Sequence, residues 1–165
     1  MATTKTKGDL AELMVATDLV RKGYKIAIPY GEDWDFDLIV CREERLERVQ
    51  VKYTESDGHV ITVRCGSHSL TNGKVRQTKL YTARMIDWLA VYDRTSDRCY
   101  YIPAVELGDG KSVMHIRLSA SLNNQRERIH FAEEYLSLDP SPQQAMEPAG
   151  LEPATSRMQT GRSPN

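Results

Sequence analysis

Residues 46–54, which read LERVQVKYT, constrain the fold more than any other stretch of the sequence. Apolar and polar residues alternate through VQVK, and the side chains of a β-strand alternate between its two faces. The segment therefore predicts a strand with Val49 and Val51 on one face and Gln50 and Lys52 on the other. A strand with one solvent-exposed face gives the same pattern, so the two polar residues alone do not indicate a site.

The preceding segment, DFDLIV at residues 35–40, supplies a second observation. Three apolar residues follow Asp37 directly, which predicts that this carboxylate lies inside a strand at 35–42 rather than in the acidic loop before it. A hairpin-like pairing with 46–54 would bring Asp37 beside Gln50 and Lys52. A carboxylate, an amide oxygen and a lysine that converge in this way are typical of a site for a hard cation such as Mg²⁺.

An amphipathic helix is predicted at residues 7–22, with Asp9 as its N-cap and Gly23 just after its end. Glu12 shares the apolar face of this helix. A carboxylate there costs free energy unless a charged group meets it. Taken alone, the position is explained better by a boundary glutamate that reaches water than by a metal ligand.

The rest of the chain predicts further strands, a turn and a second helix. Strands are predicted at residues 24–29, 59–65, 88–93, 99–103 and 113–118. ESDG at 55–58 predicts a hairpin turn between 46–54 and 59–65, and 123–136 predicts a closing helix. This order predicts one α/β (α+β) domain with a mixed central sheet flanked by helices.

Composition limits the alternatives. A chain of 165 residues, with 40% hydrophobic and 27% charged residues, suits one soluble globular domain. Residues 139–165 hold five of the seven prolines and show no apolar period, so we predict a folded unit at 5–138 and a disordered tail after it. The sequence has no apolar run long enough to span a membrane and no apolar core of a secretory signal, so we expect a cytoplasmic protein.

The three cysteines are widely spaced and odd in number, which predicts free thiols rather than disulfides or a zinc site. No glycine-rich nucleotide-binding motif occurs, and the four histidines lack the spacing of metal ligands. The net charge of −1 does not by itself indicate nucleic-acid binding, so any such binding depends on local patches.

Taken together, KGDLAE, KGYKIAIP, DFDLIV and RVQVKYT resemble the PD-(D/E)xK nuclease superfamily, and most of all its group I intron-associated homing endonucleases, in which glutamine replaces the second acid. The resemblance continues through IDWLAVYDRTSDRCYYIP and covers about residues 5–138. It implies a restriction-endonuclease-like core and an Mg²⁺-dependent endonuclease that hydrolyses double-stranded DNA, with Mn²⁺ as a possible substitute.

The resemblance also implies roles for individual residues. The catalytic set would be Glu12, Asp37, Gln50 and Lys52, and the metal ligands would be Glu12, Asp37, Gln50 and Val51. Lys52 would orient water or stabilise the anionic transition state. Gln50 stands where most of the superfamily has an acid, which leaves the number of bound ions open.

DNA binding is expected from the segment VRCGSHSLTNGKVRQTK at 63–79, which predicts a β-ribbon with basic residues. Arg64, Lys74, Arg76 and Lys79 would contact phosphates or bases in the major groove, although a solvated hairpin is an equal alternative. Near-neutral charge favours a homo-oligomer, dimer or tetramer, on the DNA. A structure-specific nuclease of the junction-resolvase kind and a catalytically silent DNA-binding domain remain alternatives.

Overall fold

The computed structural model describes residues 3–31, 33–71, 74–119 and 129–139. The elements are, in chain order, α1 (Thr4–Arg21), β1 (Lys25–Ala27), β2 (Leu38–Arg42), β3 (Arg45–Thr54), β4 (Val60–Arg64), β5 (Gly66–Thr71), β6 (Lys74–Leu80), β7 (Trp88–Asp93), β8 (Arg98–Pro103), the 3₁₀ helix η1 (Ala104–Leu107), β9 (Val113–Arg117), β10 (His130–Phe131) and the 3₁₀ helix η2 (Ala132–Tyr135).

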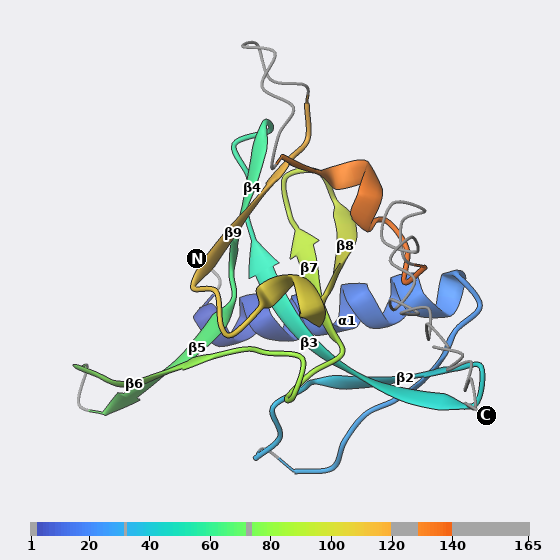
Figure 1. Cartoon of the computed structure of the whole chain (residues 1–165), viewed down its shortest axis with the longest axis horizontal. Coiled ribbons are helices and arrows are strands. Elements are labelled where there is room, and N and C mark those ends of the chain that lie inside the picture. The colour runs from blue at the N-terminus through green and yellow to red at the C-terminus, as the bar shows by residue number, and fades with distance from the viewer. Residues whose placement is uncertain (1–2, 32, 72–73, 120–128, 140–165) are drawn as a thin grey trace, which may run out of the picture.

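A five-stranded sheet in the order β1-β2-β3-β7-β8 forms the centre of the fold (Figure 1). Strands β3 and β7 are parallel, whereas the other neighbours in this sheet are antiparallel. The two residues between β2 and β3, Glu43 and Glu44, both have positive φ, at 46° and 67°. Such a two-residue turn matches the twist of a tight hairpin. The predicted mixed sheet and the pairing of the DFDLIV and VQVKY strands are therefore confirmed.

The sheet is covered on both faces. Along β7, Trp88, Ala90 and Tyr92 pack with the buried side of α1, while Leu89 and Val91 pack with strands of the second sheet. All six residues of β7 are buried, as expected for a central strand between two layers. The second layer is a three-stranded sheet in the order β10-β9-β4.

Strands β5 and β6 form a separate antiparallel ribbon that extends away from the two layers (Figure 1). The predicted β-ribbon is therefore present. Residues 72 and 73, between the two strands, lie outside the described residues, as do the side chains of residues 68–77.

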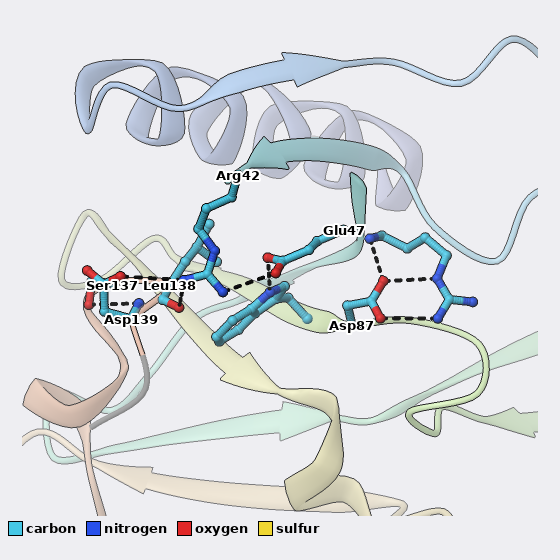
Figure 2. Close-up of polar contacts among 8 residues, drawn as sticks. Arg42, Glu47, Asp87, Ser137, Leu138 and Asp139 are labelled. Atoms are coloured by element: carbon cyan, nitrogen blue, oxygen red, sulfur yellow. Dashed lines mark hydrogen bonds and ion pairs between the residues drawn. The ribbon is translucent and has the colours of Figure 1, made fainter. Parts of the chain in front are cut away.

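A polar cluster around Arg42 and Glu47 joins strands of the central sheet (Figure 2). Arg42 Nη2 contacts Glu47 Oε1 at 3.0 Å, and the other carboxylate oxygen of Glu47 accepts from the Trp88 indole at 2.8 Å. Arg42 Nη1 also donates to the Leu138 carbonyl at 2.9 Å, which ties the fully buried Leu138 to β2. Since these contacts join β2, β3 and β7, they hold the strands that carry the candidate site.

The helix begins earlier than the sequence predicts. Thr3, not Asp9, is the N-cap, because its hydroxyl oxygen accepts from the Thr6 amide at 3.2 Å. Asp9 lies inside α1 and is exposed. The predicted end is confirmed, since Gly23 follows the C-cap with a φ of 87° that L-residues rarely adopt.

The predicted hairpin between 46–54 and 59–65 is wrong. β4 pairs with β9 in the second sheet, not with β3. The buried Asp93 accepts hydrogen bonds from the amide and hydroxyl of Ser56, both at 2.8 Å, which holds the connection over the end of β7 and turns the chain out of the central sheet.

The predicted helix at 123–136 is also wrong in its described part, residues 129–136. His130 and Phe131 form β10, parallel to Ile116 and Arg117 of β9, and only the four residues of η2 are helical. Strand pairing with β9 overrides the helical pattern of the side chains. Thus α1 is the single α-helix among the described residues, and no helix within them is long and apolar enough to cross a membrane.

The structure describes all three cysteines, and each is a free thiol, as predicted. Of the predicted tail at 139–165, only Asp139 is described, and residues 140–165 lie outside the described residues.

Candidate active site

The candidate site lies where β3 loses its neighbour β2. Pairing of the two strands ends at Leu38 and Val49, and the Asp37 amide donates to the Val49 carbonyl at 2.9 Å. Backbone groups that face one neighbour recur at every second residue of a strand. The amide and carbonyl of Val51 therefore face the same side as those of Val49, at a point beyond the start of β2.

The carboxylate of Asp37 occupies this open edge. Its Oδ2 atom accepts from the Val51 amide at 2.7 Å and from Gln50 Nε2 at 2.5 Å. Asp37 itself lies in a bend just before Leu38, so the prediction that it lies inside the strand is wrong by one residue. This placement lets its side chain continue the hydrogen bonding that the β2 backbone no longer provides.

Burial raises the pKa of the Asp37 carboxyl. The hydrogen bond from the Val51 amide, the charge of Lys52 and the Gln50 amide counteract part of this rise. An ionised Asp37 is therefore held at a cost in free energy that a bound cation would remove.

Gln50 is buried, with 8% of its surface exposed. As predicted from the alternation, Val49 and Val51 pack toward α1, whereas Gln50 lies beside Leu89 on the other side of the sheet. Its Nε2 atom donates to Asp37 Oδ2 and, at 3.2 Å, to the Val51 carbonyl. The amide N–H groups thus supply positive partial charge between two oxygen atoms.

These groups fit a hard divalent cation. The nitrogen and oxygen of a glutamine amide exchange places when the group rotates by half a turn. After that rotation the oxygens of Gln50, Asp37 and Val51 would face one another, and carboxylate, amide and carbonyl oxygens are the ligands that Mg²⁺ takes. Within the described part of the chain, no group of three or more His, Cys, Asp or Glu residues could hold a metal. The candidate ligands at this edge instead include a glutamine amide and a backbone carbonyl.

Glu12 of α1 is the second carboxylate of this region. Burial raises its pKa, and the neighbouring charges of Asp37 and Asp9 raise it further. Asp37 is thus one of the charges that act on Glu12. Glu12 is half-buried on α1, the helix that packs against β3.

Lys52 lies on the same face of β3 as Gln50 and lowers the pKa of Asp37 through its charge. Its Nζ atom donates to the Tyr81 hydroxyl oxygen at 3.2 Å and lies 5.0 Å from the centroid of the Tyr81 ring. Sequence reasoning missed Tyr81. It is 29 residues further along the chain, and neither its spacing nor its neighbours connect it with Lys52.

A cleft of about 170 Å³ opens beside Lys52. Arg64, at the end of β4, and Gly66, at the start of β5, also line it. The cleft thus contains two basic side chains and leads from the candidate site to the base of the ribbon.

The other predicted DNA-contacting residues lie on the ribbon. Lys74 and Arg76 belong to β6, and their side chains lie outside the described residues. Lys79 is exposed and forms an ion pair with Asp35. This contact links the ribbon to the loop that precedes Asp37.

Comparison with known proteins decides the family. A family model described as PD-(D/E)XK endonuclease matches residues 2–138. The chain belongs to the PD-(D/E)XK endonucleases. The sequence-based recognition of this family is confirmed, and DNA is the substrate that membership implies.

A search of solved structures finds a bacterial homing endonuclease, I-Ssp6803I, with a TM-score of 0.63. The two chains are 21% identical over 81% of this chain and 88% of the other. At this identity the likeness establishes the fold, and the predicted restriction-endonuclease-like core is confirmed. No curated protein sequence matches the chain significantly.

Proposed function

We propose that this endonuclease cleaves double-stranded DNA at specific sites with Mg²⁺, in the manner of a homing endonuclease, and that Mn²⁺ can replace Mg²⁺. The main support for this proposal is that Asp37, Gln50 and the Val51 carbonyl come together at the open edge of β3, beside Lys52. Site-specific cleavage is supported by the fold shared with a homing endonuclease. Endonucleases of this family generally use divalent metal ions.

In this proposal Asp37, Gln50, Val51 and Glu12 would hold the cation, which would lower the pKa of a water molecule and neutralise charge on the phosphate. Asp37 contributes the strongest negative charge, and its hydrogen bond from the Val51 amide fixes its direction. Lys52 provides a positive charge toward the reacting phosphate and stabilises the charge that develops there. The basic residues Arg64, Lys74, Arg76 and Lys79 bind the DNA on the ribbon side of the cleft.

The test compares three DNA substrates, namely supercoiled plasmid, linear duplex and a four-way junction, each with Mg²⁺ and with EDTA. Site-specific cleavage predicts discrete fragments from linear duplex that contains the target. Cleavage confined to the junction, whatever its sequence, would replace the proposal with a structure-specific nuclease. Binding without cleavage under all conditions would leave a silent DNA-binding domain.

Lys52→Met tests whether cleavage belongs to this site. Cleavage should fall by about 10²-fold or more, which is the usual loss when one electrostatic catalytic group is removed. Lys25→Met removes an exposed lysine of β1 that pairs with Cys41, near the opposite end of β2 from Asp37, and this variant should cleave as the parent does. Equal activity of the two variants would exclude Lys52 from the reaction.

We also propose that the protein acts as a homo-oligomer, because cutting both strands of a duplex needs two sites. Among the described residues, Ile28, Leu46 and Val105 are large apolar side chains with 70% or more of their surface exposed. Single exposed apolar side chains also occur on monomers, so the proposal rests on the need for two sites. Light scattering of the free protein and of its complex with duplex DNA should give a multiple of the chain mass. A monomer in both samples would contradict this proposal.

A further inference from the structure

Tyr81 closes the base of the ribbon. Its amide donates to the Cys65 carbonyl at 3.0 Å, and these two residues immediately follow β6 and precede β5. The next pair, Gly66 and Leu80, is so close that a Cβ atom at Gly66 would lie 2.7 Å from the Lys79 carbonyl oxygen. The two strands are therefore held tightly where the ribbon joins the body of the protein.

The side chain of Tyr81 is buried, with 4% of its surface exposed, in the core beneath the second sheet. Packing in this core fixes the ring, whereas Lys52 has a flexible stem that loses conformational entropy when its ammonium is held in one place. The ring face and the hydroxyl oxygen both contact that ammonium. The fixed ring of Tyr81 can therefore restrict the position of the Lys52 ammonium group.

The chemistry of this partner suits a catalytic lysine. An ammonium group can only donate, so the phenol oxygen must accept. A neutral hydroxyl and a ring face orient the positive charge without cancelling it, whereas a carboxylate partner would neutralise it. Lys52 therefore keeps a full charge for a phosphate while its direction is set by Tyr81.

We propose that Tyr81 is a positioning residue that holds the Lys52 ammonium in place for cleavage from the base of the ribbon. The inference rests on the proposed function of Lys52 and adds a residue to it. Because the amide of Tyr81 closes the ribbon and its side chain contacts Lys52, one residue connects the base of the ribbon with the position of Lys52.

A double-mutant cycle on supercoiled plasmid with Mg²⁺ tests the proposal, with the maximal single-turnover rate measured apart from the half-saturating protein concentration. Tyr81→Phe removes the hydroxyl and keeps the ring. In the parent it should lower the maximal rate about 10-fold, as expected for losing one hydrogen bond to a charged group. In a Lys52→Met background it should lower the rate less than about 2-fold, because the partner is already absent.

If Tyr81 had a purely structural role, Tyr81→Phe would lower the maximal rate by the same factor in the parent and in Lys52→Met. That result would overturn the proposal. The matched control is Tyr92→Phe. Tyr92 is equally buried and donates to Asp97 at 2.6 Å, but it packs on the α1 side of the sheet. The Tyr92→Phe variant should cleave at the same maximal rate as the parent. The melting temperature of each variant shows whether a lower rate comes from a loss of folded protein.

A second readout needs no cleavage. In protein labelled with ¹³C and ¹⁵N at lysine, the ε-protons of Lys52 should be shifted upfield by the Tyr81 ring. Tyr81→Phe should keep this shift and lose the slowly exchanging ammonium signal, while Tyr81→Leu should lose both. Lys52 signals that are the same in all three proteins would overturn the inference. If the parent cuts no DNA, the proposed function fails, and these spectra still decide whether Tyr81 holds Lys52.

Discussion

Gln50→Glu tests the proposed metal site most sharply, because the contacts of Gln50 predict both the sign and the size of its effect on stability. In the parent, Gln50 Nε2 donates to an Asp37 oxygen at 2.5 Å and to the Val51 carbonyl at 3.2 Å. A carboxylate in that place would put a third oxygen against two others, with no proton or cation between them. Without metal the variant should therefore be less stable than the parent.

The loss of stability in Gln50→Glu can be calculated in two ways, with both carboxyl groups ionised or with one of them protonated. Two unit charges about 4 Å apart repel by about 4 kcal/mol at an effective dielectric constant of about 20. Protonating one carboxyl of ordinary pKa, about 4.3, instead costs about 3.7 kcal/mol at pH 7. Both calculations give a loss of about 4 kcal/mol in the free energy of unfolding. This loss corresponds to a fall in melting temperature of about 10 °C for a chain of this size.

The pH dependence has a definite sign. The crowded pair binds a proton more tightly in the folded protein than in the unfolded chain, so the folded pKa is raised. Stability relative to the parent is then lost as the pH rises above the unfolded value. At pH 5 the same protonation costs only about 1 kcal/mol, so most of the deficit should disappear. Mg²⁺ at pH 7 should also remove it, because the cation binds between the oxygens.

Melting in EDTA at pH 7 and pH 5, and with Mg²⁺ at pH 7, measures these three states. The double variant Asp37→Asn with Gln50→Glu is the control, since it exchanges the amide and the carboxylate without adding charge. It should melt within a few degrees of the parent. An unchanged melting temperature of Gln50→Glu in EDTA, together with an unchanged Mg²⁺ dependence of cleavage, would refute the shared site.

Three further outcomes are expected. Asp37→Asn should abolish cleavage, and added metal should not restore it. The same variant should have a higher melting temperature than the parent at pH 7 in EDTA, because burial raises the pKa of the Asp37 carboxyl. This gain in melting temperature should vanish in acid, where the parent carboxyl is protonated. Replacing Lys74, Arg76 and Lys79 with Gln should weaken DNA binding and reduce its salt slope by about 0.9 for each phosphate that these side chains neutralise, and an unchanged slope would remove the ribbon from the interface. Removal of residues 140–165 should leave melting temperature and cleavage unchanged, as checked by calorimetry and the plasmid assay, because that segment is rich in proline and lacks an apolar period.

The pairing of β2 with β3 could be predicted from the sequence because the two-residue period of a strand is a local property. The same period placed Gln50 and Lys52 on one face, and the polar start of DFDLIV placed Asp37 near them. Contacts set by distant parts of the chain could not be read in this way. The turn at 55–58 looks like a hairpin locally, yet the hydrogen bonds of Asp93 to Ser56 direct the chain into another sheet. Likewise, β10 forms because β9 is beside it, against a helical pattern of side chains.

The use of glutamine instead of a second acid has a physical reason at this edge. Asp37 is already held at a cost, since burial raises its pKa even with an amide beside it and Lys52 nearby. A second carboxylate would add the repulsion calculated above to every cation-free molecule. Gln50 avoids that repulsion because its N–H groups bond the same oxygens that a cation would bind, and a rotation of the amide offers an oxygen instead. In the proposed metal site, Gln50 would thus give a stable cation-free state and would present one negative charge fewer to the metal.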